Sequence, residues 1–260
     1  MFKNKGFRVL TVLVMLLALT SISCGVSSLP FLATETPTPT ATFTPSPTPT
    51  PSSTPTLTPT ATPLPTGVQT EEQADGSTLF NDYDNKYQLV LSEEWVIIPF
   101  DQDELGALVE ELSKDNPKFK DAAAAFENLD PDVFRLVALS QNQKYFESGA
   151  VPNLNITAIE NDVLSAMPLS FVTGALEESF KQNGTKVVSE GVNTIDNPNG
   201  VEIEYLDIEQ EVNGVKISQR LIVFQSNSKL IMVTLTAPDT FKSEIFTFGD
   251  LIGASIKLFK

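Results

Sequence analysis

The sequence VEIEYLDIEQEVNGVKISQRLIVFQSNSKLIMVTLTA, residues 201–237, contains three strand-like runs that are separated only by turn signals. These runs are Val201–Gln210, Val215–Gln225 and Leu230–Ala237. The turns are centred on Asn213-Gly214 and Asn227-Ser228. Short turns between successive strands require antiparallel pairing. Together with a further strand-like run at Thr185–Ile195, these segments predict a four-stranded antiparallel meander.

One helix is predicted before the meander in the sequence and another after it. The segment Leu169–Gln182 carries apolar residues at helical spacing, and Asn183-Gly184 supplies a left-handed stop. Pro238 breaks the last strand, and we expect Asp239 to cap a final helix. The residues expected on the two buried stripes are Leu169, Val172, Leu176 and Phe180 in the first helix, and Phe241, Ile245, Phe248 and Ile252 in the second.

The preceding part of the chain also alternates between strands and helices. The predicted strands are Tyr87–Leu91, Trp95–Ile98, Val133–Leu139 and Leu154–Ile159. The turn Ser92–Glu94 joins the first two, and an irregular loop at 141–152 separates the last two. Asp101 with Glu104 indicates the capped start of one helix, and Asn116-Pro117 the start of another. Their apolar stripes are Leu105, Leu108, Val109 and Leu112, and Phe119, Ala122, Ala123 and Phe126.

This order of elements favours an antiparallel sheet with helices packed on it, of class α+β or a three-layer α/β/α sandwich. The strand pair that ends in a tryptophan, Tyr87-Gln-Leu-Val-Leu-Ser-Glu-Glu-Trp95, resembles the opening of PsbP-like domains, with Ser92 where that family often has proline. The mid-domain helix, the meander and the close Thr234-Leu-Thr-Ala-Pro238 before a Phe-rich helix are similar too. The resemblance covers most of residues 77–260. It implies an α/β/α sandwich that serves binding or assembly rather than catalysis, and it carries over no site residue.

The first 24 residues have the features of an export signal. Three basic residues precede the apolar run Val9–Leu19, which is shorter than the roughly 20 residues of a membrane-spanning helix. The pattern resembles a bacterial lipoprotein signal, with Ser21 where leucine is usual and the small Ser23 before Cys24. The resemblance implies that Cys24 receives a diacylglyceryl group and becomes the N-terminus. Ordinary signal cleavage nearby and an uncleaved helical anchor are the alternatives.

We therefore divide the chain into a signal peptide (1–23), a tether (24–76) and a globular domain (77–260). From Thr34 to Thr66, 24 of the 33 residues are threonine or proline, which favours an extended, polyproline-like spacer. Residues Gly67–Gly76 are expected to continue this disorder. The formal charge is −16, and beyond residue 23 it is 14 minus 33, or −19, because three basic and no acidic residues lie in the signal. Such an acidic chain disfavours nucleic acid as a partner.

The residue inventory excludes several kinds of catalysis. The chain has no histidine and only one cysteine, so Ser-His-Asp and Cys-His constellations are absent. Metal sites built on histidine or thiolate lack their ligands for the same reason. No glycine-rich phosphate loop is found. We therefore predict no catalytic residue, no metal or cofactor site and no enzymatic activity.

Clustered carboxylates are the remaining candidates. Glu93-Glu94 beside Trp95 would suit a sugar-binding cleft, but adjacent side chains on extended backbone point apart, which favours a solvated turn. The segment Asn81–Asn85 groups oxygen ligands suited to calcium, although a polar turn is the preferred interpretation. A third group is expected to form a solvated helix face, with docking of a basic partner as the alternative. Its members are Asp101, Asp103, Glu104, Glu110 and Glu111. Four aromatic residues are expected in the core: Trp95, Tyr87, Phe134 and Phe171.

These observations predict a lipoprotein held through Cys24 at the extracytoplasmic face of the cell membrane. Its globular domain is expected to be a non-catalytic interaction or assembly module with an extracytoplasmic protein partner. A receptor for a small ligand or ion is the first alternative, and a carboxylate-dependent hydrolase is the second.

Overall fold

The computed structural model describes residues 65–115, 119–120, 133–146, 151–189, 193–212 and 214–259. Their strands form two antiparallel sheets. The smaller sheet has the order β1 (Val68–Glu72), β2 (Thr78–Asp82), β3 (Tyr87–Leu91) and β12 (Lys257–Leu258). The larger sheet has the order β4 (Trp95–Ile97), β5 (Phe134–Ser140), β6 (Asn153–Glu160), β11 (Lys229–Pro238), β10 (Val215–Ser226), β9 (Glu204–Val212) and β7 (Lys186–Val187), and β8 (Asn193–Thr194) also pairs with β9.

The meander is confirmed for β9, β10 and β11, which pair in succession. Asn227 and Ser228 both have positive φ, at 48° and 60°, as a type I′ hairpin turn requires. The run Thr185–Ile195 is not one strand, and only β7 and β8 form within it. The ladder breaks after β7 because Val188 and Ser189 both donate their backbone N–H to the carbonyl of Asp207.

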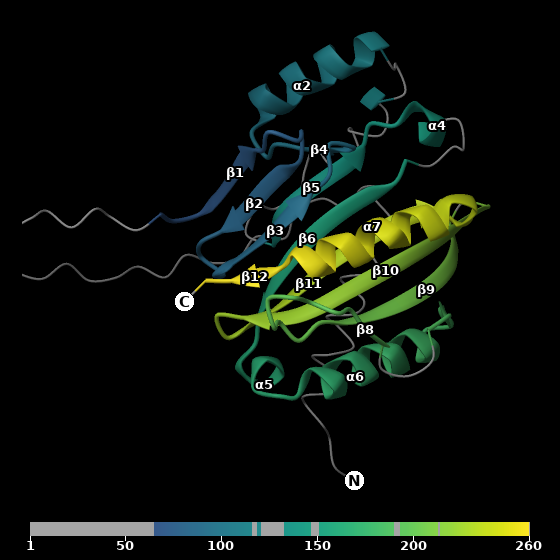
Figure 1. Cartoon of the computed structure of the whole chain (residues 1–260). Coiled ribbons are helices and arrows are strands. Elements are labelled where there is room, and N and C mark those ends of the chain that lie inside the picture. Colours follow the sequence, from purple (N-terminus) through teal and green to yellow (C-terminus); the bar gives the residue numbers. More distant parts are fainter. Residues whose placement is uncertain are drawn as a thin grey trace, which may run out of the picture. The chain divides into compact units, whose positions relative to one another are not determined.

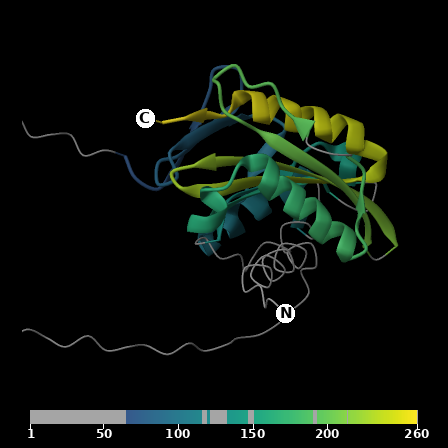
Figure 2. The ribbon, with the colours of Figure 1, turned by 90° about the horizontal axis from the view of Figure 1, so that it is seen from below.

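Helices cover both faces of the larger sheet. Helix α7 (Lys242–Ser255) and helix α6 (Leu169–Gln182) lie on opposite sides of it (Figures 1 and 2). On β11, Ile231 and Val233 belong to the cluster shared with α7 and the small sheet, whereas Leu230 and Met232 pack with α6. Because side chains alternate along a strand, one β-strand serves both cores. The expected α+β class, with helices packed on a mainly antiparallel sheet, is confirmed.

A third cluster lies under α2 (Gln102–Asp115) on the face of the larger sheet that α6 also covers. Val137 and Leu139 of β5 point into it and meet Leu105 of the helix. Asp101 caps this helix as expected, since its Oδ1 accepts the N–H groups of Asp103 and Glu104 at 3.0 Å each. Of the next expected helix, Phe119 is buried. The remainder of its stripe, Ala122, Ala123 and Phe126, lies outside the described residues.

The helices flanking the meander show one success and one error. Helix α6 has the bounds that the sequence predicts, and it buries all four expected stripe residues. It is followed by Gly184 at φ 78°. Helix α7 buries Ile245 and Ile252, as expected. Asp239, however, starts the short 3₁₀ turn Asp239–Phe241 and does not cap the helix. Its Oδ1 instead accepts the hydroxyl of Ser218 at 2.9 Å.

The expected extent of the tether is wrong at its C-terminal end. The strand β1 (Val68–Glu72) forms inside the segment that was expected to be disordered. Its hairpin turn holds Gly76 at φ 83°, where glycine has no steric penalty. The two strands expected beside Ser92–Glu94 both form, but β3 pairs with β2 and β12 whereas β4 pairs with β5. Those strands therefore join the two sheets.

The loop expected at 141–152 contains the short helix α4 (Gln143–Phe146), and another short helix, α5 (Asp162–Ser165), follows β6. Within the described ranges, no helix is long and apolar enough to cross a membrane. Cys24 and the expected signal peptide lie outside those ranges, so lipidation of Cys24 stays a prediction.

Candidate functional site

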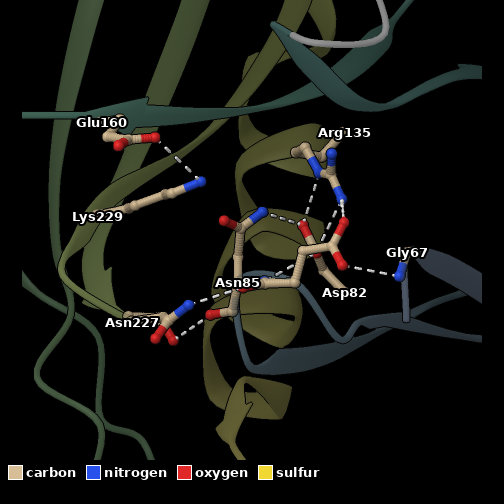
Figure 3. A network of polar contacts seen from close by, with 9 residues as sticks. Gly67, Asp82, Asn85, Arg135, Glu160, Asn227 and Lys229 are labelled. Atoms are coloured by element: carbon tan, nitrogen blue, oxygen red, sulfur yellow. Dashed lines mark hydrogen bonds and ion pairs between the residues drawn. The ribbon is translucent and has the colours of Figure 1, made fainter. Parts of the chain in front are cut away.

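The turn between β2 and β3, where the sequence suggests calcium ligands, is bound by an arginine of the larger sheet (Figure 3). Arg135 of β5 binds both carboxylate oxygens of Asp82, from Nε at 2.9 Å and from Nη2 at 3.0 Å. Its Nη2 also donates to Asp84 Oδ2 at 2.9 Å. Asp82 is fully buried. The guanidinium therefore pairs with the carboxylates of Asp82 and Asp84.

Further hydrogen bonds tie this turn to three other segments. Gly67 donates its N–H to Asp84 Oδ1 at 2.8 Å, and this bond is the main reason that the pKa of the Asp84 carboxyl is lowered. Asn227 Nδ2 donates to the carbonyl of Asp84, and Ser226 Oγ donates to that of Asn85. The turn thus connects the start of β1 with β5 and with the β10–β11 turn. Its geometry supports a structural role.

The paired glutamates before Trp95 lie in a turn, and their side chains point to different places. Glu94 accepts the hydroxyl of Ser140 at 3.1 Å. It also lies near Tyr145, whose pKa is raised by burial and by hydrogen bonding to Glu244. Glu93 lies on the other side and lines a surface depression. The two carboxylates therefore do not act as a pair.

The depression has a volume of about 330 Å³ and lies between the β1–β2 hairpin and β4. Its lining residues are Thr70, Glu72, Gly76, Thr78, Glu93, Trp95 and Ile97. Two exposed carboxylates, two hydroxyls and one aromatic side chain thus converge there, and no lining residue is basic. Trp95 is almost completely buried, and its indole Nε1 finds no hydrogen-bond partner among the described residues. The arrangement suits a cationic or polyhydroxy ligand.

The sequence pointed to Glu93 and Trp95 but missed the three residues from the hairpin: Thr70, Glu72 and Thr78. A signal for them was present. Asp75-Gly76 is a hairpin dipeptide, and in the structure Asp75 Oδ1 accepts both the N–H and the hydroxyl of Ser77. The polar composition of Val68–Glu72 conceals the strand, because every one of its residues is exposed.

Within the described part of the chain, no group of three or more acidic residues is placed to hold a metal ion. The five acidic residues expected on the helix face at 101–111 are all exposed, and Asp101 serves as the helix cap. This face is solvated, and nothing gathers its carboxylates into one site.

Three of the four aromatic residues expected in the core are buried: Trp95, Tyr87 and Phe134. The fourth prediction is wrong, because Phe171 is 60% exposed. It lies on α6 between Leu169 and Val172, which face the sheet. Successive helical residues are about 100° apart, so position 171 falls outside the buried stripe.

A buried ion network joins α7 to the meander. Arg220 of β10 binds both oxygens of Asp207 at 2.8 Å and also bonds Asp250 and the carbonyl of Phe246 on α7. Its guanidinium stacks on Tyr205, 4.2 Å from the ring centroid. Because the network engages every charge it buries, we assign it to the fold.

Glu204 of β9 is a buried carboxyl beneath α6, where its Oε2 contacts the hydroxyl of Thr173. Burial raises the pKa of Glu204, while the Thr173 contact acts in the opposite direction. The Thr173 hydroxyl also donates to the carbonyl of Leu169 at 3.1 Å. A hydroxyl has one proton. A protonated Glu204 that donates to Thr173 therefore satisfies all three groups.

We predict that Glu204→Gln stabilises the domain at neutral pH and has little effect near pH 3. The folded-state pKa of Glu204 lies above its unfolded value of about 4.3, so wild-type stability falls as pH rises from that value through the folded pKa. The glutamine variant does not lose stability in this way. Urea unfolding at several pH values measures the difference in unfolding free energy between the two proteins. A stability difference that does not change with pH would contradict the prediction.

No protein-family model matches the chain, and no curated protein matches its sequence. Similar solved structures include a cyanobacterial PsbP, CyanoP from Synechocystis sp. PCC 6803, at 11% identity and a TM-score of 0.45, over 72% of this chain and 95% of that one. LpqN of Mycobacterium tuberculosis, involved in cell envelope biogenesis, is 11% identical with a TM-score of 0.42, over 71% of this chain and 91% of that one. Protein PA94 of Pseudomonas aeruginosa is 14% identical with a TM-score of 0.33, over 38% and 67%. At these identities the likeness concerns the fold and assigns no function.

Proposed function

We propose that this chain is an extracytoplasmic lipoprotein, anchored through Cys24, whose domain is a non-catalytic module for binding a protein partner. The depression between the β1–β2 hairpin and β4 is the binding site. The observation that carries this proposal is the convergence of Glu72, Glu93 and Trp95 on one concave surface from three separate elements. The Thr/Pro-rich segment before the domain supports it, because such a spacer holds a domain away from its anchor.

The same geometry favours binding over glycoside hydrolysis. A hydrolase of the two-carboxylate type needs one carboxyl group that an apolar environment keeps protonated. Glu72 and Glu93 are both exposed to solvent, where a carboxylate is well hydrated. Two hydrated carboxylates on a rim attract a cation.

A receptor for a small ligand is the second candidate. The volume of the depression, about 330 Å³, lies at the lower end of the range for small-molecule sites, roughly 300–1,000 Å³. A ligand of this kind would raise the unfolding temperature by mass action. A thermal-shift screen with polyols and small cations distinguishes this function from protein binding.

The test of the proposed function has two arms in cells that produce the full chain. Metabolic labelling with a fatty acid should mark the wild-type protein but not Cys24→Ser, whose precursor should stay unprocessed. A photo-crosslinking amino acid at position 93 should trap one defined protein. The control is the same amino acid at Gln182, an exposed position at the end of α6. Unlabelled wild-type protein, or identical products from both positions, would overturn the proposal.

A further inference from the structure

The strand β1 has one unpaired edge. It is the end strand of its sheet and pairs only with β2 among the described strands. Gln73 donates its N–H to the carbonyl of Ser77, and Tyr83 donates its N–H to that of Gly67. In an antiparallel ladder, hydrogen-bonded pairs alternate with pairs that are not bonded. The odd-numbered residues therefore bond β2, and the N–H and C=O groups of Val68, Thr70 and Glu72 are directed outward.

Two of the three residues with outward backbone groups lie at the depression. Thr70 and Glu72 also place their side chains in its lining, beside Glu93 and Trp95. A segment that hydrogen-bonds to these two residues would thus lie beside β1, at the rim of the depression. Every second side chain of an added strand would point toward the two carboxylates.

The charge of this region selects the partner. Glu71, Glu72, Asp75 and Glu93 are acidic, and the chain has no lysine or arginine between Arg8 and Lys86. A second copy would present the same acidic edge, and the net charge of −16 makes the two copies repel each other. An extended segment with lysine or arginine at alternate positions supplies the opposite charge.

We propose that β1 receives such a basic, extended segment of a protein partner as an added strand, with one lysine or arginine side chain in the depression. This inference rests on the proposed function and names the chemistry of its partner. Backbone hydrogen bonds to Thr70 and Glu72 supply the pairing, and Glu72 and Glu93 bind the cation. Ile97, which lines the depression beside the nearly buried Trp95, offers apolar surface to the aliphatic part of that side chain.

The test titrates the full chain with two capped hexapeptides, Lys-Thr-Lys-Thr-Lys-Thr and Glu-Thr-Glu-Thr-Glu-Thr. Trp95 is the only tryptophan of the chain, so its fluorescence reports directly on the depression. The lysine peptide should shift the emission and slow amide hydrogen exchange in residues 68–72. High salt should weaken the binding of this peptide. Equal responses to the two peptides would overturn the inference.

A pair of substitutions separates the backbone edge from the side chain. Thr70→Pro removes an outward N–H while leaving the β1–β2 bonds intact, because proline is tolerated at such edge positions. It should weaken binding of the lysine peptide about tenfold. Thr70→Ala keeps that N–H and should change binding by about twofold or less. Hydrogen exchange in β2 verifies that both variants keep the hairpin. Equal binding by these two variants would refute strand addition.

A second pair tests the charge. Glu72→Gln and Glu93→Gln should each weaken binding of the lysine peptide and reduce the salt dependence of that binding. Unchanged binding in both would overturn the placement of the cation. If the peptides fail while crosslinking from position 93 succeeds, the proposed function stands and strand addition is refuted. If both fail, the depression is not a protein-binding site.

Discussion

Replacement of Arg135 by methionine is expected to destabilise the domain by about 3–5 kcal/mol, the usual loss when one partner of a buried ion pair is removed. Asp82 has no exposed side-chain surface, and Arg135 donates to both of its oxygens. Without the guanidinium, the Asp82 carboxylate still accepts the two bonds from Asn85, at 3.1 and 2.6 Å, but has lost its counter-charge. The unfolding temperature should fall on the order of 10 °C.

A double variant tests this explanation. Adding Asp82→Asn to Arg135→Met removes the buried charge, so the double variant should be more stable than Arg135→Met alone. Chemical denaturation of the four proteins in the cycle gives the coupling free energy. A loss below about 1 kcal/mol in Arg135→Met would show that the pair behaves like a surface salt bridge. The turn would then not be what joins the two sheets.

The second large effect is expected for Phe224→Ala, which should lower the free energy of unfolding by about 3–5 kcal/mol. Phe224 of β10 is fully buried, and its ring meets that of Tyr87 edge to face at 5.2 Å. The rings of Tyr87 and Phe80 in turn lie with their centroids 6.0 Å apart. These three rings join the larger sheet to the small one, so the substitution leaves a cavity at their interface. Denaturant unfolding measures the loss.

The matched control is Phe171→Ala, the same chemical change on an exposed side chain. It should alter the unfolding free energy by about 0.5 kcal/mol or less. In Phe224→Ala, amide exchange should also accelerate in β2 and β3, which pack against the ring. Similar losses of unfolding free energy in the two variants would contradict the placement of Phe224 at the interface between the two sheets.

Local sequence signals predicted the elements whose partners are adjacent in the chain. The meander of β9–β11 and the bounds of α6 belong to this class, because hairpin turns and helical stripes depend on neighbouring residues. Phe171 shows the limit of the argument, since an aromatic residue was assigned to the core without regard to its position on the helix. Asp239 shows another limit, because a contact with Ser218 on a distant strand displaced the expected cap.

The sequence indicated only some of the residues of the candidate site. Glu93 and Trp95 stood out as an acidic pair beside an aromatic residue, but the partners that form the depression come from a hairpin that the polar strand Val68–Glu72 concealed. The aspartates of the β2–β3 turn were recognised as a cluster. Their partner Arg135 lies 53 residues from Asp82, and no local pattern links the two.

The amino-acid sequence by itself determined the acidic charge, the absence of histidine and the identity of the strands and helices that depend on near neighbours. Tertiary structure decided which sheet each strand joined, which charges were neutralised and where a concave surface formed. The physical reason is range. Hydrogen bonds in turns and helices connect residues a few positions apart, whereas burial and ion pairing depend on segments that only the folded chain brings together.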